Sequence, residues 1–376
     1  MVKLGDIATY VNGYAFKPDD RGDYGLPIIR IQDLTGNTYD LGFYDGDYPK
    51  KIEINNGDIL ISWSASLGVY EWKRGKALLN QHIFKVVFDK EVDVSKKYFV
   101  YAVKYKLEEL SRKSHGATMK HVIKKDFDNT KIPFPSFVRQ KEIAERLEKT
   151  SKIISGRKKQ LQKLDELIQA RFVELFGEPI LNPKEWKIVT IGDIALDVRY
   201  GTSRPAVEGG KYPYLRMNNL TIDGHLDLTD LKYIDIPEEE LEKCVVRKGD
   251  ILFNRTNSLE LVGKTAVFDL CEDMVIAGYI IRVRLNNKMM LPEIFSQYMN
   301  HKTLKKILRG MAKGAVNQAN INAKELQSIK IYVPNMKLQD EFVTFVNQVN
   351  KSKVEIQQAL EKTQLLFDSL MQQYFG

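Results

Sequence analysis

Cysteine is scarce in this chain of 376 residues, which contains only Cys244 and Cys271. Two cysteines cannot build a disulfide framework or a multi-cysteine zinc module, and free thiols favour a reducing, cytoplasmic setting. The five histidines include no pair spaced four residues apart, which excludes the helical zinc motif of metalloproteases. The sequence also lacks a run of about 18 apolar residues, so it predicts no membrane span. Asp6 lies where a signal peptide would need an apolar run.

Excess charge of one sign is also small. The chain has 57 Lys+Arg against 49 Asp+Glu, and a net charge of +8 permits an acidic partner without identifying one. Hydrophobic residues make up 43% of the chain, which is enough to build packed cores. At about 150 residues per domain, the length predicts two or three domains.

Catalytic motifs are sparse as well. Pro18-Asp19 followed by Glu71-Trp72-Lys73 matches the PD…ExK pattern of metal-dependent nucleases, which need carboxylates on adjacent strands around Mg²⁺. Residues 18–22 have the composition of a turn, so a solvated loop is the favoured interpretation. We expect no catalytic residue, no metal site and no cofactor bound by this chain. The sequence therefore favours a binding protein over an enzyme.

A tandem repeat is the strongest feature that is present. Six short motifs occur twice in the same order, at an offset that drifts from 187 to 199 residues. In the first copy they are Gly5-Asp6-Ile7-Ala8, Gly13, Pro27-Ile28-Ile29-Arg30, Gly57-Asp58-Ile59-Leu60, Gly116-Ala117 and Pro135 with Gln140; in the second copy they are Gly192-Asp193-Ile194-Ala195, Gly201, Pro213-Tyr214-Leu215-Arg216, Gly249-Asp250-Ile251-Leu252, Gly314-Ala315 and Pro334 with Gln339. The unit is far longer than a solenoid repeat, so each copy should contain a complete domain.

Each copy begins with a region typical of a mixed α+β domain. Short apolar runs at residues 28–31, 59–61 and 83–88 predict strands, and residues 95–110 predict a helix that packs on them. The pattern returns near residues 188–334. We therefore expect two globular target-binding domains, at residues 1–137 and 178–336.

Each copy ends with a long helix, predicted at residues 138–177 and 337–376. Apolar residues alternate by four and three positions, which is typical of a coiled-coil seam. The seam residues are Ile143, Leu147, Ile154, Leu161, Leu164 and Ile168 in the first helix and Phe342, Val346, Val349, Ile356, Leu360 and Phe367 in the second. At about 1.5 Å per residue, a helix of roughly 39 residues spans about 58 Å.

The two helices should pack antiparallel with pseudo-twofold symmetry, because a globular domain separates them in sequence. Parallel packing would crowd both domains at one end. Four polar residues interrupt the seam, and they either fix its register or lie exposed where the helices fray: Arg157, Arg171, Lys353 and Thr363.

Basic residues gather before the Gly-Ala motif of both copies, where they could neutralise DNA phosphates. The alternative is a solvated helix face. The loop after the first strand, residues 12–17 and 200–205, differs between copies, as two modules that bind different targets would require. The candidate DNA contacts are Tyr14, Lys17, Arg112, Lys113, His115, Thr118, Lys120, Thr202, Ser203, Arg204, Lys305, Arg309, Lys313, Asn317, Gln318 and Asn320. Trp63, Trp72 and Tyr70 could stack on bases, but a core position is favoured.

Together these features resemble the specificity subunit of type I restriction-modification systems, over essentially the whole chain. The motifs that carry the resemblance are the two Gly-Asp-Ile-Leu turns, Gly201-Thr202-Ser203, Pro133-Phe134-Pro135 leading to Gln140-Lys141-Glu142-Ile143, and Leu164-Asp165-Glu166-Leu167 followed by Leu175-Phe176-Gly177. The second proline-containing helix start, Val333-Pro334-Asn335, is degenerate.

The resemblance implies a non-catalytic DNA-recognition subunit. Each domain would read one half of a bipartite, asymmetric duplex site, and the helices would separate the halves and dock two modification subunits. S-adenosylmethionine, ATP and Mg²⁺ would be bound by the modification and restriction subunits. A metal-dependent nuclease and a coiled-coil adaptor that binds no DNA remain as alternatives.

Overall fold

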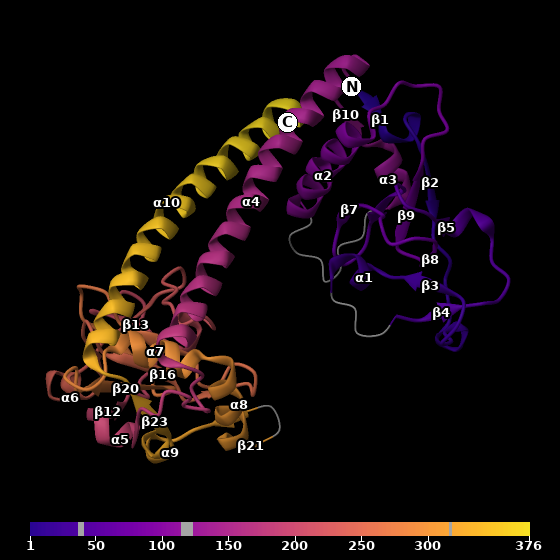
Figure 1. Cartoon of the computed structure of the whole chain (residues 1–376). Coiled ribbons are helices and arrows are strands. Elements are labelled where there is room, and N and C mark those ends of the chain that lie inside the picture. Colours follow the sequence, from indigo (N-terminus) through magenta and orange to yellow (C-terminus); the bar gives the residue numbers. More distant parts are fainter. Residues whose placement is uncertain (37–40, 114–122, 316–317) are drawn as a thin grey trace. The chain divides into compact units, whose positions relative to one another are not determined.

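The computed structural model describes residues 1–36, 41–113, 123–315 and 318–376 (Figure 1). They form two compact units, Met1–Lys158 with Gln358–Gly376, and Lys159–Gln357. Each unit contains a globular domain and segments of both long helices. The described part of the chain contains no helix long and apolar enough to cross a membrane.

Two four-stranded sheets form the first domain. The antiparallel sheet has the order β2 (Thr9–Asn12), β9 (Ile83–Val87), β6 (Ile59–Ser62) and β7 (Gly68–Glu71). The second sheet has the order β4 (Phe43–Tyr44), β3 (Leu26–Ile29), β8 (Ala77–Leu79) and β5 (Glu53–Ile54), with β3 and β8 parallel. Side chains of both sheets, including Leu60 and Leu79, share a buried core.

Shorter elements complete this domain. They are η1 (Leu4–Asp6), η2 (Pro18–Asp20), α1 (Ile31–Thr35), η3 (Lys50–Ile52), α2 (Lys96–Lys113), α3 (Lys124–Asn129) and the pair β1 (Val2–Lys3) with β10 (Lys131–Ile132). The predicted strands and helix are present, with one correction. The strand predicted at residues 28–31 ends at Ile29, because the Asp33 carboxylate accepts the Arg30 N–H at 2.8 Å and begins α1 at Ile31.

The second domain repeats this topology strand for strand. Its antiparallel sheet is β12 (Ala195–Tyr200), β20 (Ile280–Leu285), β16 (Ile251–Asn254) and β18 (Thr265–Val267), and its mixed sheet is β14 (Lys232–Ile234), β13 (Tyr212–Leu215), β19 (Met274–Ile276) and β15 (Val245–Val246). The pair β11 (Lys187–Thr190) with β23 (Lys330–Val333) matches β1 with β10. The repeated order of elements is what the predicted pseudo-twofold relation requires.

The remaining elements of the second domain are short helices and a small sheet. Its helices are α5 (Ile191–Ile194), η4 (Met217–Asn219), α6 (Glu238–Cys244), α7 (Pro292–Asn300), α8 (Lys302–Met311) and α9 (Ala323–Ser328). They are followed in space by a small sheet of β17 (Thr256–Asn257), β22 (Gln318–Asn320) and β21 (Lys313–Ala315). This sheet contains the predicted Gly314-Ala315 motif.

The Gly-Asp-Ile-Leu motif is a turn that starts the central strand of each antiparallel sheet. Gly57 and Gly249 have φ values of +89° and +94°, which glycine adopts without a steric cost. The following carboxylates of Asp58 and Asp250 accept backbone N–H groups three residues earlier, at 2.8 and 2.9 Å. This motif is therefore structural in both domains.

The long helices are α4 (Phe137–Phe176) and α10 (Met336–Phe375), each within one residue of its predicted bounds. In each unit, segments of α4 and α10 lie side by side and antiparallel (Figure 1). In the second unit Phe172 meets Phe342, with 5.7 Å between ring centroids, and Lys353 meets Asp165 at 2.5 Å. In the first unit Arg157 donates to the carbonyl of Ala359, near Leu360.

The predicted seam is confirmed. Nine of its twelve members are buried, and the three half-buried ones lie toward the helix centres: Leu161, Leu164 and Ile356. All four polar seam residues lie at the helix contact, where Arg157 bonds the Thr363 hydroxyl and Arg171 pairs with Glu341 at 2.6 Å. Of the two predicted roles, register fixing fits these cross-helix contacts.

A buried glutamine attaches the start of each long helix to its domain. The Gln140 amide donates to the carbonyls of Pro135 and Asp93, at 2.9 and 3.2 Å, and its oxygen accepts the Ser95 N–H at 2.9 Å. Gln339 makes the equivalent contacts in the second domain. The duplicated Pro…Gln motif of the sequence thus has a mechanical role.

Candidate nucleic-acid interface

The loop after the first strand is held in the same way in both domains. A Cβ on Gly13 would lie 2.0 Å from the Asn80 carbonyl oxygen, and one on Gly201 would lie 2.1 Å from that of Ile276. Glycine is therefore required for the loop to approach the neighbouring strand so closely. The next residues, Tyr14 and Thr202, donate their N–H groups across this contact, at 2.8 and 2.9 Å.

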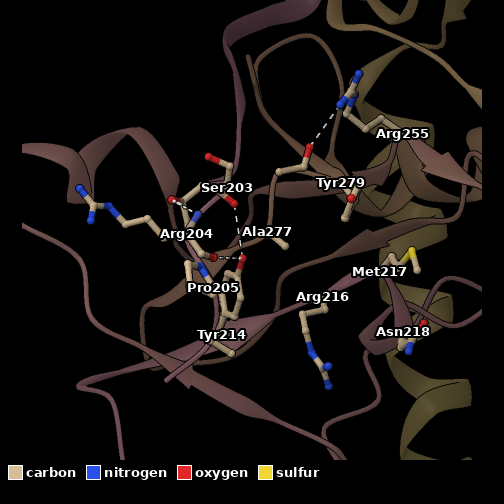
Figure 2. Close-up of a pocket in the computed structure, with 13 residues that line it drawn as sticks. Ser203, Arg204, Pro205, Tyr214, Arg216, Met217, Asn218, Arg255, Ala277 and Tyr279 are labelled. Carbon is tan, nitrogen blue, oxygen red and sulfur yellow. Dashed lines mark hydrogen bonds between the residues drawn. The ribbon is translucent and has the colours of Figure 1, made fainter. Parts of the chain in front are cut away.

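In the second domain this loop borders a pocket with a volume of about 580 Å³ (Figure 2). Its walls come from the ends of β12, β13 and β16 and from the link between β19 and β20. The charged side chains and the larger hydroxyl-bearing side chains that line the pocket are Thr202, Arg204, Tyr214, Arg216, Arg255 and Tyr279. The Tyr214 hydroxyl donates to the Arg204 carbonyl at 3.1 Å and supports the loop from below. Residues far apart in sequence thus meet at the ends of strands from both sheets.

Two of the pocket's three arginines are neutralised within the domain. Arg204 forms a two-pronged ion pair with Glu240, at 2.7 and 3.0 Å, and this hydrogen bonding holds the pKa of the Glu240 carboxyl below its ordinary value. Arg216 pairs with Asp230 at 2.7 Å and lowers the pKa of that carboxyl in the same way. The predicted contact Arg204 is therefore present at the pocket, but its charge is shared.

The first domain has the same backbone arrangement with different side chains. The backbone N–H of Trp63 donates to the His82 carbonyl at 3.2 Å. In the same way, the backbone N–H of Arg255 donates to the Tyr279 carbonyl at 2.9 Å. The Trp63 and His82 rings lie 4.9 Å apart. Trp72 belongs to the core, as the sequence favours, whereas Trp63 is half-buried at this strand end. Sequence reasoning missed Arg255 and Tyr279, although their alignment with Trp63 and His82 follows from the repeat.

The other predicted contacts of the loops are described too. Tyr14 is 44% exposed, with its ring 5.0 Å from that of Phe16. Lys17 is exposed, and its backbone N–H donates to the Asp20 carboxylate at 2.6 Å. Ser203 lines the pocket beside Thr202, whose hydroxyl accepts the Arg204 N–H at 3.1 Å. The structure brings Thr202, Ser203 and Arg204 together in one pocket.

The basic cluster of the second domain is less uniform than the sequence suggests. Arg309 is exposed and donates to the Glu260 carbonyl at 3.4 Å. Lys305 departs from the prediction of a solvent-facing phosphate contact, because its ammonium donates to the Gly263 carbonyl. Burial lowers the pKa of Lys305 to about 7, so much of its charge is lost near neutral pH.

The small sheet holds two further candidates. Gln318 is exposed, whereas the Asn320 amide oxygen accepts the Thr256 hydroxyl at 3.1 Å and so joins β17 to β22. Only the backbone is described for Arg112 and Lys113 in α2 and for Lys313 in β21. Four candidates lie outside the described residues: His115, Thr118, Lys120 and Asn317.

The residues of the nuclease-like pattern do not resemble a metal centre. Asp19 lies in the short helix η2, and Glu71, at the end of β7, pairs with Lys73 at 3.1 Å. Among the described residues, no group of three or more His, Cys, Asp or Glu side chains is placed to hold a metal ion. The alternative of a PD…ExK nuclease therefore has no support in this geometry.

Comparison with known proteins identifies the family. The model of the type I restriction modification DNA specificity domain matches the chain twice, at residues 1–166 and 183–365. The chain belongs to this family. The type I specificity subunits EcoKI and EcoBI of Escherichia coli are 25% and 23% identical, over 99% and 100% of this chain and 87% and 85% of theirs. MjaVIII of Methanocaldococcus jannaschii is 24% identical over 96% of this chain and 90% of its own.

Solved structures of type I systems share the fold. The S subunit from M. genitalium matches with a TM-score of 0.55 at 16% identity, covering 100% of this chain and 95% of its own. A chain from a study of type I complex assembly matches with a TM-score of 0.58 at 18% identity, covering 99% and 95%. As a specificity subunit, the chain is a non-catalytic DNA-recognition component. The absence of a recognisable catalytic motif in its sequence agrees with this role.

Proposed function

We propose that this specificity subunit reads a bipartite, asymmetric DNA site, with one half-site bound by each domain. The observation that carries the proposal is the duplicated strand-end site, where backbone hydrogen bonds recur and side chains differ. Trp63 and His82 occupy in the first domain the positions of Arg255 and Tyr279 in the second. Equal scaffolds with unequal side chains are what two different half-sites require.

The long helices are proposed to separate the half-sites and to dock two modification subunits. Those subunits would bind S-adenosylmethionine and flip the target adenine, and restriction subunits with ATP and Mg²⁺ would join them for cleavage. In this scheme the assembly is cytoplasmic, where host DNA is accessible. The seam contacts of α4 and α10, such as Arg171 with Glu341, would keep the spacing constant.

Methylome sequencing of the host, with and without this chain, tests the proposal directly. We expect one bipartite adenine-methylated motif to disappear when the chain is deleted and to return when it is restored. Methylation that is unchanged by deletion would contradict the proposal. Binding of the assembled complex to duplexes that carry the motif should also weaken steeply with salt, which a coiled-coil adaptor without DNA-binding activity does not predict.

A further inference from the structure

Arg255 differs from the other arginines of the second domain's pocket in its partners. Arg204 and Arg216 each pair with a carboxylate. Among the described residues no carboxylate pairs with Arg255, whose guanidinium contacts the Gly278 carbonyl at 3.4 Å (Figure 2). Its Nε is buried without a hydrogen-bond partner, as is that of Arg216, so a ligand would meet the terminal amino groups of the guanidinium. Among the described residues, Arg255 is therefore the pocket arginine whose charge no carboxylate pairs.

The position of Arg255 is fixed on three sides. The backbone N–H of Arg255 donates to the Tyr279 carbonyl at 2.9 Å, and the backbone carbonyl of Arg255 accepts the Ile321 N–H at 2.9 Å. The guanidinium lies 5.0 Å from the centre of the Tyr200 ring, within cation–π distance. The Tyr200 hydroxyl in turn accepts the N–H of Ala323 at 2.8 Å. A fixed guanidinium loses little conformational entropy when it binds a ligand.

The terminal amino groups and the uncompensated charge of Arg255 suit a ligand with adjacent acceptors. In duplex DNA, guanine presents O6 and N7 side by side in the major groove, and arginine is their commonest partner. A phosphate also accepts from arginine, but phosphates are identical in every sequence and carry no sequence information. The residue at this position changes from Trp63 to Arg255 between the domains, while the pocket arginine Arg216 is retained as Arg30. A residue that varies between the two readers suits base recognition better than phosphate contact.

We infer that Arg255 reads a guanine in the half-site of the second domain. This inference rests on the proposed function, because it assumes that the domain reads DNA at these strand ends. It identifies Arg255 as a specificity-determining residue, and it gives Tyr200 the role of a positioning residue beneath the guanidinium.

The test uses the full chain assembled with its modification subunits. Once the methylated motif is known, each base pair of the second half-site is replaced in turn, and binding is measured for the wild type and for Arg255→Ala. Replacement of the recognised guanine should weaken wild-type binding by about 5- to 150-fold and weaken Arg255→Ala binding less than about twofold. Every other position should keep its wild-type discrimination.

Arg247→Ala is the matched control, because Arg247 belongs to the same domain but pairs with Glu242 and Asp273 outside the pocket. It should leave discrimination at the guanine unchanged. Arg255→Lys keeps the charge and most of the side chain, so it serves if Arg255→Ala does not assemble. It should lose much of the discrimination at the guanine, because lysine lacks the planar fork.

Three results would overturn the inference. The first is a half-site for the second domain that contains no G·C pair. Equal weakening of all sequences by Arg255→Ala, with near-normal binding by Arg255→Lys, would instead assign a phosphate contact. The third result is that Arg255→Ala and Arg255→Lys both keep the wild-type discrimination at the guanine. A wild-type complex with no bipartite motif would reject the proposed function itself, and it is recognised before any variant is made.

Discussion

At the scale of single residues, the buried glutamines have the clearest structural role. The Gln339 amide donates to the carbonyls of Met289 and Pro334, and its oxygen accepts the Leu291 N–H, all at 2.9 Å. The side chain is fully buried, so water cannot replace these bonds. Gln140 has the same place in the first domain, which explains why both glutamines recur in the sequence.

Gln339→Leu should destabilise the second unit by about 2 kcal/mol or more, because three buried backbone groups lose their partner. The unfolding midpoint in urea measures the change. Gln348→Leu is the matched control, because Gln348 lies exposed on the same helix and should shift the midpoint little. Equal midpoints for the two variants would show that the buried amide contributes nothing.

Lys305 gives the second unit a specific pH dependence. Its pKa of about 7 in the folded domain lies below that of a lysine in the unfolded chain, about 10.4. Between these values the unfolded state binds more protons, so stability rises with pH from about 7 to about 9.5, by at most about 1.4 kcal/mol per pH unit. Above that range, buried tyrosines such as Tyr332, whose pKa is raised by burial, oppose the trend.

Lys305→Met should flatten this rise, because the side chain no longer titrates. Thermal unfolding midpoints measured from pH 7 to pH 9.5 provide the test. Lys306→Met, at the neighbouring exposed position, should keep the wild-type slope. Parallel profiles for wild type and Lys305→Met would contradict the placement of the amine beside Gly263.

At the scale of elements, the two long helices follow their sequence closely. The alternating spacing predicts which residues face the partner helix, because neighbours on one helix face are set by local geometry. The spacing does not predict which side chains pair across the two helices. Lys353 meets Asp165 and Arg171 meets Glu341, and these pairs depend on the register between segments 188 and 170 residues apart.

Insertion of one heptad into each helix should lengthen the gap of the methylated motif by about three base pairs, since seven residues add about 10.5 Å. The half-sites should stay unchanged, because a heptad restores the facing of the seam to within about 20°. Methylome sequencing measures the gap. Insertion of two residues into each helix is the control, because it rotates the seam by about 200° and should abolish methylation. An unchanged gap after the heptad insertion would contradict the spacer role.

At the scale of the whole molecule, the chain consists of two readers built on one topology. Each has an antiparallel sheet and a mixed sheet, and each ends in a long helix. Among the described residues, the domains differ in the break between α7 and α8 at His301, where the first domain has the single helix α2. Duplication with local divergence predicts that the readers are separable in specificity.

Exchange of residues 188–334 for those of another specificity subunit should change one half of the methylated motif and leave the other half intact. The reason is that the strand-end site of each domain is formed from its own residues. Methylome sequencing of the chimera reports both halves at once. A change in both halves, or in neither, would reject separate readers.

The sequence by itself determined the repeat, the long helices, the seam and the main strands, because these depend on residues close together in the chain. Periodicity sets helix faces, and glycine with a backbone-capping aspartate sets the turn at Gly57 and Gly249. The sequence is also poor in cysteine and in catalytic motifs, which agrees with a recognition subunit. The family comparison established that role.

The tertiary structure alone decided which side chains converge at the candidate reading site. Arg204, Arg216, Arg255 and Tyr279 come from four separate connections. Pairing of β12 and β16 with β20 brings together the connections of Arg204, Arg255 and Tyr279, and the parallel pair of β13 with β19 adds that of Arg216. It also decided which cations are available. The half-buried Lys305 bonds the Gly263 carbonyl and Arg204 is paired, whereas Arg255 has no carboxylate partner among the described residues. Burial and pairing depend on neighbours distant in sequence, so charge patterning alone could not separate these three cations.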